Sequence, residues 1–257
     1  MGYTITEKIL ARVSGLDHVK AGDEVMAKPD FITAYDFPGY TDLYFKQMKE
    51  DFGIEKVAEP ERIAMFIDHM VPAATPKEEE LHIGTRKWCA ENNVPLFERK
   101  GIGHQVASEV GYAVPGAFVV HFDGHISQLG TFGTLAMGIR RNLLEALVNE
   151  KISIKVPHTV RVNLTGTLAK GVLARDVFHH LVREMGPASC RFQVLELGGP
   201  GLAQLTTEGL QTITGLAMFT GAITAIVNPD QARLDYALPR ARKKLDPVYS
   251  DPDADYA

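Results

Sequence analysis

The sequence predicts a mixed α/β fold, because short apolar runs typical of buried strands alternate with amphipathic segments typical of helices. Composition agrees, since 45% of the residues are hydrophobic and 23% are charged, as in ordinary globular domains. Length agrees as well, because 257 residues can bury a full core in one large or two small domains. We expect two α/β domains.

The first half of the chain carries clear helix and strand signals. Thr4 and Thr75 each precede a glutamate by three residues, which is a capping box, and Pro76 suits the first position of a helix. Helices are expected after Thr4 and over 42–52, 76–92 and 103–110. Buried strands are expected over 62–69, 95–99 and 117–122.

The second half continues this alternation. Four apolar residues recur at helical spacing and predict one long helix over 132–148: Leu135, Ile139, Leu143 and Leu147. A strand hairpin is expected after it, followed by helices over 173–185 and 206–219 and strands over 191–197 and 222–227. We divide the chain into domains at 1–154 and 155–235, and we expect partial disorder in the Asp- and Pro-rich tail at 236–257.

Charge and patterning exclude several classes of protein. The net charge of −5 argues against a general nucleic-acid binder. No run approaches the ~18 apolar residues of a membrane span, and the N-terminal stretch lacks the apolar core of a signal peptide. The only two cysteines, Cys89 and Cys190, are far apart and form no disulfide framework. We expect a cytoplasmic protein with no membrane or nucleic-acid partner.

Polar residues follow three of the predicted strands. Asp68 and His69 end one strand, His104 lies in the turn after another, and Asp123 and His125 follow a third. The carboxyl ends of parallel strands face the crevice in which α/β proteins bind ligands. These five residues are therefore the candidate catalytic groups.

Two kinds of chemistry suit these groups. A carboxylate beside an imidazole raises its pKa and fixes its tautomer, which suits proton transfer to and from a small carboxylate substrate. His69, His104 and His125 are also candidate ligands of a divalent metal. The alternative is that each is a hydrogen-bonded structural residue. His121 stays ambiguous, and the other histidines are expected on the surface: His18, His82, His158, His179 and His180.

A glycine-containing segment follows Asp123 and His125. We expect Gly130, Thr131 and Gly133 to turn the chain into a helix whose N-terminal amides face the crevice and bind a carboxylate. Arg140 and Arg141 would then supply bidentate contacts to the same acidic substrate, if they do not lie on a solvated face.

These motifs resemble the large-subunit family of aconitase and isopropylmalate dehydratase. The similarity rests on segments in matching order: DHMVP at 68–72, GIGHQV at 101–106, VPGAFVVHFDGH at 114–125, GTFGTLAMGI at 130–139, VNLTGTL from 162 and TTEGLQTIT at 206–214. The resemblance implies an aconitase-like three-layer α/β domain followed by a smaller α/β domain. It also implies active-site roles for Asp68, His69, His104, Asp123 and His125.

The resemblance covers only the first half of the family's chain. Family members hold a [4Fe-4S] cluster on three cysteines of a later domain, and neither Cys89 nor Cys190 lies in such a segment. We therefore expect no cluster ligated by this chain alone. Gly124 stands where the family motif has a serine, and Phe219 lies near the position of a family glutamate.

Two functions remain open at this point. One is a cluster-free hydro-lyase acting on a small hydroxy acid, with protonated His104 or His125 as the acid or with a divalent metal held by histidines. The resemblance implies a separate small swivel-domain subunit as its partner. The other is a non-catalytic binding or assembly subunit that completes a site with a chain carrying the iron-sulfur domain.

Overall fold

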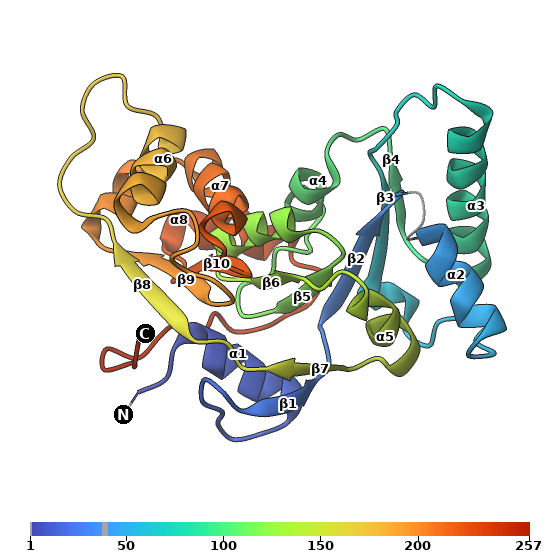
Figure 1. Ribbon diagram of the computed structural model, residues 1–257, viewed down its shortest axis with the longest axis horizontal. Coiled ribbons are helices and arrows are strands. Elements are labelled where there is room, and N and C mark those ends of the chain that lie inside the picture. Colours follow the sequence, from blue (N-terminus) through green and yellow to red (C-terminus); the bar gives the residue numbers. More distant parts are fainter. Residues whose placement is uncertain (1, 38–40) are drawn as a thin grey trace.

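The computed structural model describes residues 2–37 and 41–257. Helices and parallel strands alternate along them, which confirms the predicted mixed α/β class (Figure 1). We call the part up to residue 155 the large lobe and the part from residue 159 the small lobe. No helix in the described ranges is long and apolar enough to cross a bilayer.

The large lobe is built on a five-stranded parallel sheet in the order β4-β3-β2-β5-β6. Its strands are β2 (Phe31–Tyr35), β3 (Ile63–Ile67), β4 (Leu96–Glu98), β5 (Phe118–His121) and β6 (Leu135–Gly138). Thr33 of β2 is in register with Ala64 of β3 and His121 of β5. The carboxyl ends of the strands therefore meet at one edge of the sheet.

Helices cover both faces of this sheet. They are α1 (Ile5–Ser14), α2 (Thr41–Glu50), α3 (Pro76–Asn92), α4 (Gly103–Glu109) and α5 (Asn142–Asn149), with a 3-10 turn η1 (Pro60–Arg62). Apolar residues of α1, α2 and α5 share one core, and α4 packs into the core on the opposite face. The capping boxes predicted at Thr4 and Thr75 are both confirmed.

The small lobe is built on a three-stranded parallel sheet in the order β10-β9-β8. Its elements are β8 (Thr159–Asn163), α6 (Ala174–Met185), β9 (Val194–Gly198), η3 (Pro200–Gln204), α7 (Thr207–Leu216), η4 (Ala217–Thr220), β10 (Thr224–Val227), α8 (Gln231–Ala237) and η5 (Leu238–Arg240). Phe178, Leu197 and Ile213 contribute to its separate core. Residues of η2 (Gly124–Phe132) pack against α7 and β10 and so join the lobes.

The prediction of one long helix over 132–148 is wrong. Leu135 belongs to β6, and only Asn142–Asn149 is helical. Leu135 and Met137 are buried because β6 lies between β5 and the small lobe, where the Thr224 hydroxyl donates to the Ala136 carbonyl. Burial on both faces gives an apolar run that mimics helical spacing.

The predicted hairpin after residue 152 is also wrong. β7 (Ile152–Lys155) pairs antiparallel with the distant β1 (Glu24–Ala27), whereas β8 pairs in parallel with β9. The sequence showed two strands but not their partners, because partners far apart in the chain leave no local signal. The domain division at 154 and 155 stays a prediction, although the chain changes sheets between β7 and β8.

The tail at 236–257 makes specific contacts with the rest of the chain, and its expected partial disorder stays a prediction. Asp251 accepts a hydrogen bond from the Tyr3 N–H and pairs with Lys8, and Gly2 forms a bridge with Ala254. The Ser250 hydroxyl binds the buried Glu196 carboxylate of β9. Asp251 and Ser250 thus have specific partners, and these contacts join the first helix to the small lobe.

Replacement of Gly130 tests the packing between the lobes. A Cβ atom at Gly130 would lie 1.8 Å from the Ala225 carbonyl oxygen, so the backbones must separate in Gly130→Ala. We expect a loss of about 3 kcal/mol in the free energy of unfolding, measured by urea denaturation. Gly84→Ala on α3 is the control, because its Cβ meets nothing within 4 Å, and it should raise stability slightly. If Gly130→Ala were as stable as Gly84→Ala, the close packing of Gly130 against Ala225 would be contradicted.

Candidate active site

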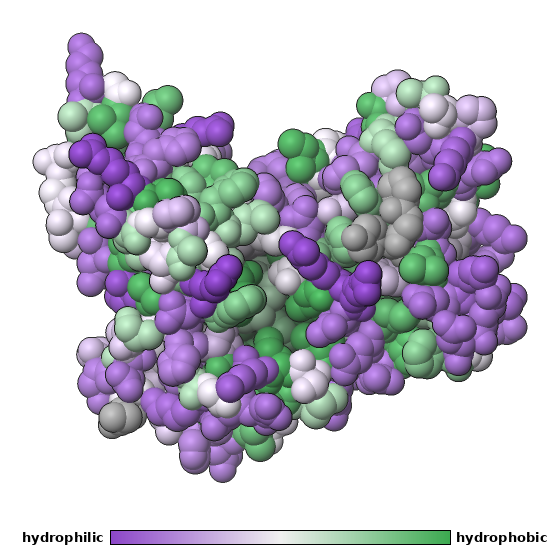
Figure 2. All heavy atoms as spheres, in the orientation of Figure 1, coloured by the Kyte–Doolittle hydropathy of each residue, from purple (hydrophilic) through white to green (hydrophobic). Residues whose placement is uncertain are grey.

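Three predicted segments meet at the carboxyl edge of the large sheet. Asp68 and His69 follow β3, Asp123 follows β5, and His104 lies in α4 immediately after the loop from β4. The space-filling surface dips between the small lobe and the part of the large lobe that carries α3, and α4 lies between them in the ribbon view (Figures 1 and 2). The topology therefore brings together the residues that the sequence selected.

His69 is held in a hydrogen-bonded pair. Its Nδ1 lies 2.6 Å from Oδ1 of Asp68, whose Oδ2 accepts a hydrogen bond from the Gly103 N–H at 2.5 Å. The hydrogen bond from Asp68 raises the pKa of His69 above its usual value, and nearby Asp36 and Asp123 act in the same direction. The imidazole is 38% exposed, so it reaches solvent.

His104 has the opposite character. It is buried, and its Nε2 finds no hydrogen-bond partner among the described residues. Burial lowers the pKa of His104 to about 4. Desolvation therefore favours the neutral imidazole near pH 7, which disfavours the predicted role of protonated His104 as the acid.

His125 completes the row of imidazoles. Its ring centroid lies 6.2 Å from that of His104. Its Nδ1 is 3.4 Å from Oδ1 of Asp123 but lacks the alignment of a hydrogen bond. Burial alone would raise the pKa of Asp123, but the His125 N–H, the adjacent imidazoles and the Tyr35 hydroxyl lower it overall. Asp123 is thus an anion beside the histidines.

Tyr35 is a site residue that the sequence analysis missed. Its ring stacks on His69 with centroids 4.2 Å apart, and its hydroxyl donates to Oδ2 of Asp123 at 3.0 Å. The ring also meets His104 edge-on at 6.0 Å. An aromatic residue in a buried strand looks like core, but its place at the very end of β2 was the available signal.

His121 and Asp36 were missed as supports of the site. His121 is buried and accepts the Asp123 N–H on Nδ1 at 2.8 Å, which places its own proton on Nε2. Burial holds the pKa of His121 well below its usual value. Asp36 accepts the N–H groups of Asp68 and His69, and burial raises its pKa.

His82 corrects another expectation. The sequence placed it on the surface, but it is 2% exposed and its Nε2 lies 2.8 Å from Oδ2 of Asp36. His82 stands in the polar first half of α3, where the sequence shows no apolar stripe to mark the buried face.

The predicted carboxylate cradle is not formed. Gly130, Thr131 and Gly133 end the 3-10 helix η2 rather than begin an α-helix, so no helix N-terminus faces the crevice there. Thr131 is buried and shares a hydrogen bond with Thr214 of α7. These three residues join the lobes. Arg140 and Arg141 are exposed just after β6, at the edge where the other strands end.

The residues that lie close enough to share a metal ion are not the three histidines predicted from the sequence, His69, His104 and His125. The described residues close enough to share one ion are Asp36, Asp68 and His69, whose ligand atoms lie within 4.8 Å of one another. Both carboxylates already accept hydrogen bonds from N–H groups or imidazoles. The arrangement serves as a hydrogen-bonded network.

The cysteines do not fit an iron-sulfur cluster. Cys89 is buried in the core of the large lobe and Cys190 in the core of the small lobe. Burial raises the pKa of the Cys89 thiol to about 12, which disfavours the thiolate that a cluster requires. The steps proposed below therefore use side chains of this chain and no cluster.

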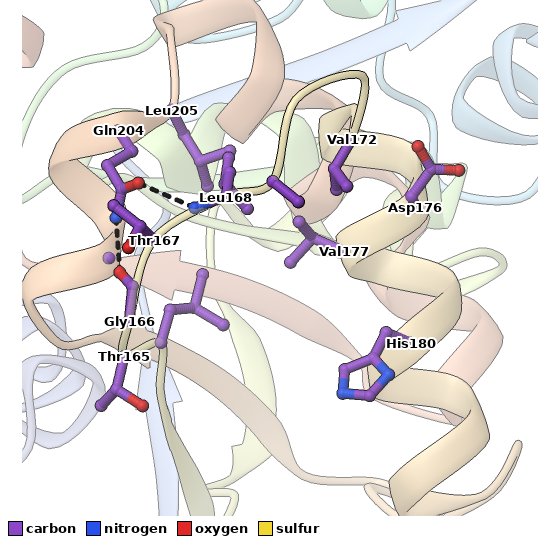
Figure 3. Close-up of a pocket in the computed structure, with 13 residues that line it drawn as sticks. Thr165, Gly166, Thr167, Leu168, Val172, Asp176, Val177, His180, Gln204 and Leu205 are labelled. Carbon is purple, nitrogen blue, oxygen red and sulfur yellow. Dashed lines mark hydrogen bonds between the residues drawn. The ribbon is translucent and has the colours of Figure 1, made fainter.

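A separate pocket of about 300 Å³ lies in the small lobe (Figure 3). Leu168, Val172 and Val177 form part of its apolar wall, and Gln204 binds the loop at Gly166 and Leu168. None of the five predicted catalytic residues lines it.

Comparison with known proteins identifies the family of this chain. The sequence profile of the aconitase family (aconitate hydratase) matches residues 8–254, so the chain belongs to this family. This confirms the resemblance drawn from the motifs and agrees with the fold.

Several similar proteins are large subunits. The chain is 35% identical over 100% of its length to 3-isopropylmalate dehydratase large subunit 1 of Methanopyrus kandleri. It is 35% identical over 90% of its length to the probable methanogen homoaconitase large subunit of Methanosarcina mazei. A third relative, the 3-isopropylmalate dehydratase large subunit of Aquifex aeolicus, is 31% identical over 100% of the chain. The chain spans 61%, 59% and 59% of these relatives' lengths.

The buried neutral state of His104 has a measurable cost in acid. Unfolded His104 binds a proton below pH 6.5, whereas the folded imidazole binds it only near pH 4, so stability falls as the pH drops through this window. Lowering the pH from neutral to about 5 should reduce the free energy of unfolding of the parent chain. We expect the reduction in His104→Gln to be about 2 kcal/mol smaller. Urea denaturation at both pH values measures this.

His179→Gln, at an exposed position of α6, controls for the loss of an imidazole. Equal acid sensitivity of the parent and the His104 variant would show that His104 is not held neutral.

Proposed function

We propose that this chain supplies the acid-base groups of a hydro-lyase site acting on a small hydroxy acid. The main observation behind this proposal is that two histidines differ in their surroundings. His69 is exposed beside a carboxylate, whereas His104 is buried and its Nε2 has no partner among the described residues. Family membership supports the class of reaction. A separate small subunit as partner is part of the proposal, supported by the large-subunit relatives.

His69 is the proposed general acid. Because Nδ1 is bound to Asp68, Nε2 of the imidazolium is left to protonate the leaving hydroxyl of the substrate. The C–O bond breaks, the hydroxyl leaves as water, and the proton on the neighbouring carbon passes to a base. His125 is the candidate base on this chain, since its ring is 42% exposed and lies beside Asp123.

In this proposal, neutral His104 and the two arginines bind the substrate and transfer no proton. Nε2 of His104 is buried without a described partner, so a substrate oxygen that hydrogen-bonds to it would satisfy the group. Arg140 and Arg141 lie at the same sheet edge and offer charge for the substrate carboxylates. Asp68 and Asp123 repel those carboxylates, which favours binding of the hydroxyl end beside the histidines.

A second candidate is a non-catalytic binding or assembly subunit. The observation that favours it is Phe219, whose ring is 53% exposed and meets His125 at 5.9 Å, near the position of the family glutamate. In this alternative, a partner chain would bring the missing acid or base to the crevice.

Turnover of His69 variants tests the catalytic proposal. The chain, mixed with the small subunit of a 3-isopropylmalate dehydratase, would be offered 3-isopropylmalate, malate and citrate, with the unsaturated acid followed by ultraviolet absorbance. We expect His69→Gln to lower kcat at least ~100-fold, because the proton donor is removed. His179→Gln should keep the parent rate. Undiminished turnover in folded His69→Gln would refute the assignment.

A further inference from the structure

A buried hydrogen-bonded pair, Asp36 and His82, lies behind the site and takes no part in the steps above. Asp36 follows β2 and is 0% exposed, and His82 comes from α3. Nε2 of His82 lies 2.8 Å from Oδ2 of Asp36. Neither side chain reaches the crevice surface, so the pair cannot contact a substrate directly.

The second oxygen of Asp36 holds the chain that carries the acid. Oδ1 accepts the N–H of Asp68 at 2.8 Å and the N–H of His69 at 3.2 Å. The Asp36 N–H itself donates to the Phe66 carbonyl at 3.0 Å. One residue thus fixes the end of β3 from both its side chain and its backbone.

This turn needs an external anchor. Met70, directly after His69, has a φ of 51°, in the left-handed region that is unfavourable for a side chain larger than glycine. The strained residue persists only if neighbouring contacts hold the turn, and the Asp36 carboxylate supplies two of them.

The other ring nitrogen of His82 has a partner on α3 itself. Its Nδ1 lies 3.9 Å from the Glu79 carboxylate, and Glu79 pairs with Arg86 at 2.8 Å. Arg86 makes two hydrogen bonds, of 3.0 Å and 2.7 Å, to Glu98 at the end of β4. A chain of polar contacts therefore runs from β4 through α3 to the backbone of the site.

We infer that Asp36 and His82 form a positioning pair that orients the Asp68–His69 dipeptide for catalysis. This inference rests on the proposed function. Without the imidazole, the Asp36 carboxylate is buried with no side-chain donor among the described residues, and it must rotate or draw in water. Either change releases the two amides and moves His69, and small displacements of a proton donor lower its efficiency strongly.

Amide hydrogen exchange tests the anchor without any substrate. In the ¹⁵N-labelled chain, His82→Leu should speed exchange at Asp68 and His69 about tenfold, while the strand amides of Ala64 and Ile32 keep their protection. His82→Gln should restore slow exchange, because its amide nitrogen can donate to Asp36. Thr85→Val is the matched control, since Thr85 is buried on α3 and, among the described residues, its hydroxyl bonds only to the Leu81 carbonyl.

Asp36→Asn is the second variant, because it keeps the shape and weakens the acceptor. It should also speed exchange at the Asp68 and His69 amides. It replaces His82→Leu in the comparison if that variant does not fold. Unchanged exchange at Asp68 and His69 in the folded variants would overturn the inference.

Turnover separates this inference from the proposed function. With a small subunit and an active parent chain, His82→Leu should lower kcat about tenfold with KM nearly unchanged, and His82→Gln should recover most of it. Faster exchange with unchanged kcat would overturn the catalytic positioning while the proposed function stands. If the parent shows no turnover, the proposed function fails, and exchange alone decides whether the pair holds the dipeptide.

Discussion

The carboxylate of Asp68 is the contact on which the crevice depends. One oxygen binds Nδ1 of His69 and the other accepts the N–H of Gly103, so a single side chain joins the end of β3 to the start of α4. Gly103 is required for this approach, because a Cβ there would lie 2.9 Å from Asp68 Oδ2 and 3.0 Å from Phe66. His104 follows Gly103 directly, so both unlike histidines are placed through Asp68.

Solvent exposure makes these histidines chemically different. His69 keeps contact with water and has a carboxylate partner, whereas His104 is enclosed beside Tyr35 and His121. The same side chain is therefore a proton carrier at one position and a neutral hydrogen-bonding group at the other. The buried layer below, formed by Asp36, His82 and His121, fixes both through backbone and ring contacts.

The helix starts and most of the site residues could be predicted from the sequence, because their signals are local. The capping boxes at Thr4 and Thr75 are short-range signals, and polar residues directly after apolar strands mark the ligand-binding edge of a parallel sheet. Asp36, Tyr35 and His82 escaped notice because their partners are distant in the chain. The β6 strand was misread because burial on both faces leaves no alternation, and Gly130 serves close packing against β10 rather than a substrate.

The central claim is that two histidines packed against the same tyrosine, Tyr35, hold different protonation states. Imidazole ¹H–¹⁵N NMR on the chain, assigned with His69→Gln and His104→Gln, measures this most directly. The account predicts that, at the ordinary imidazole midpoint of about pH 6.5, His69 is mostly the doubly protonated cation and His104 is neutral. A neutral His69 beside a charged His104 would contradict it.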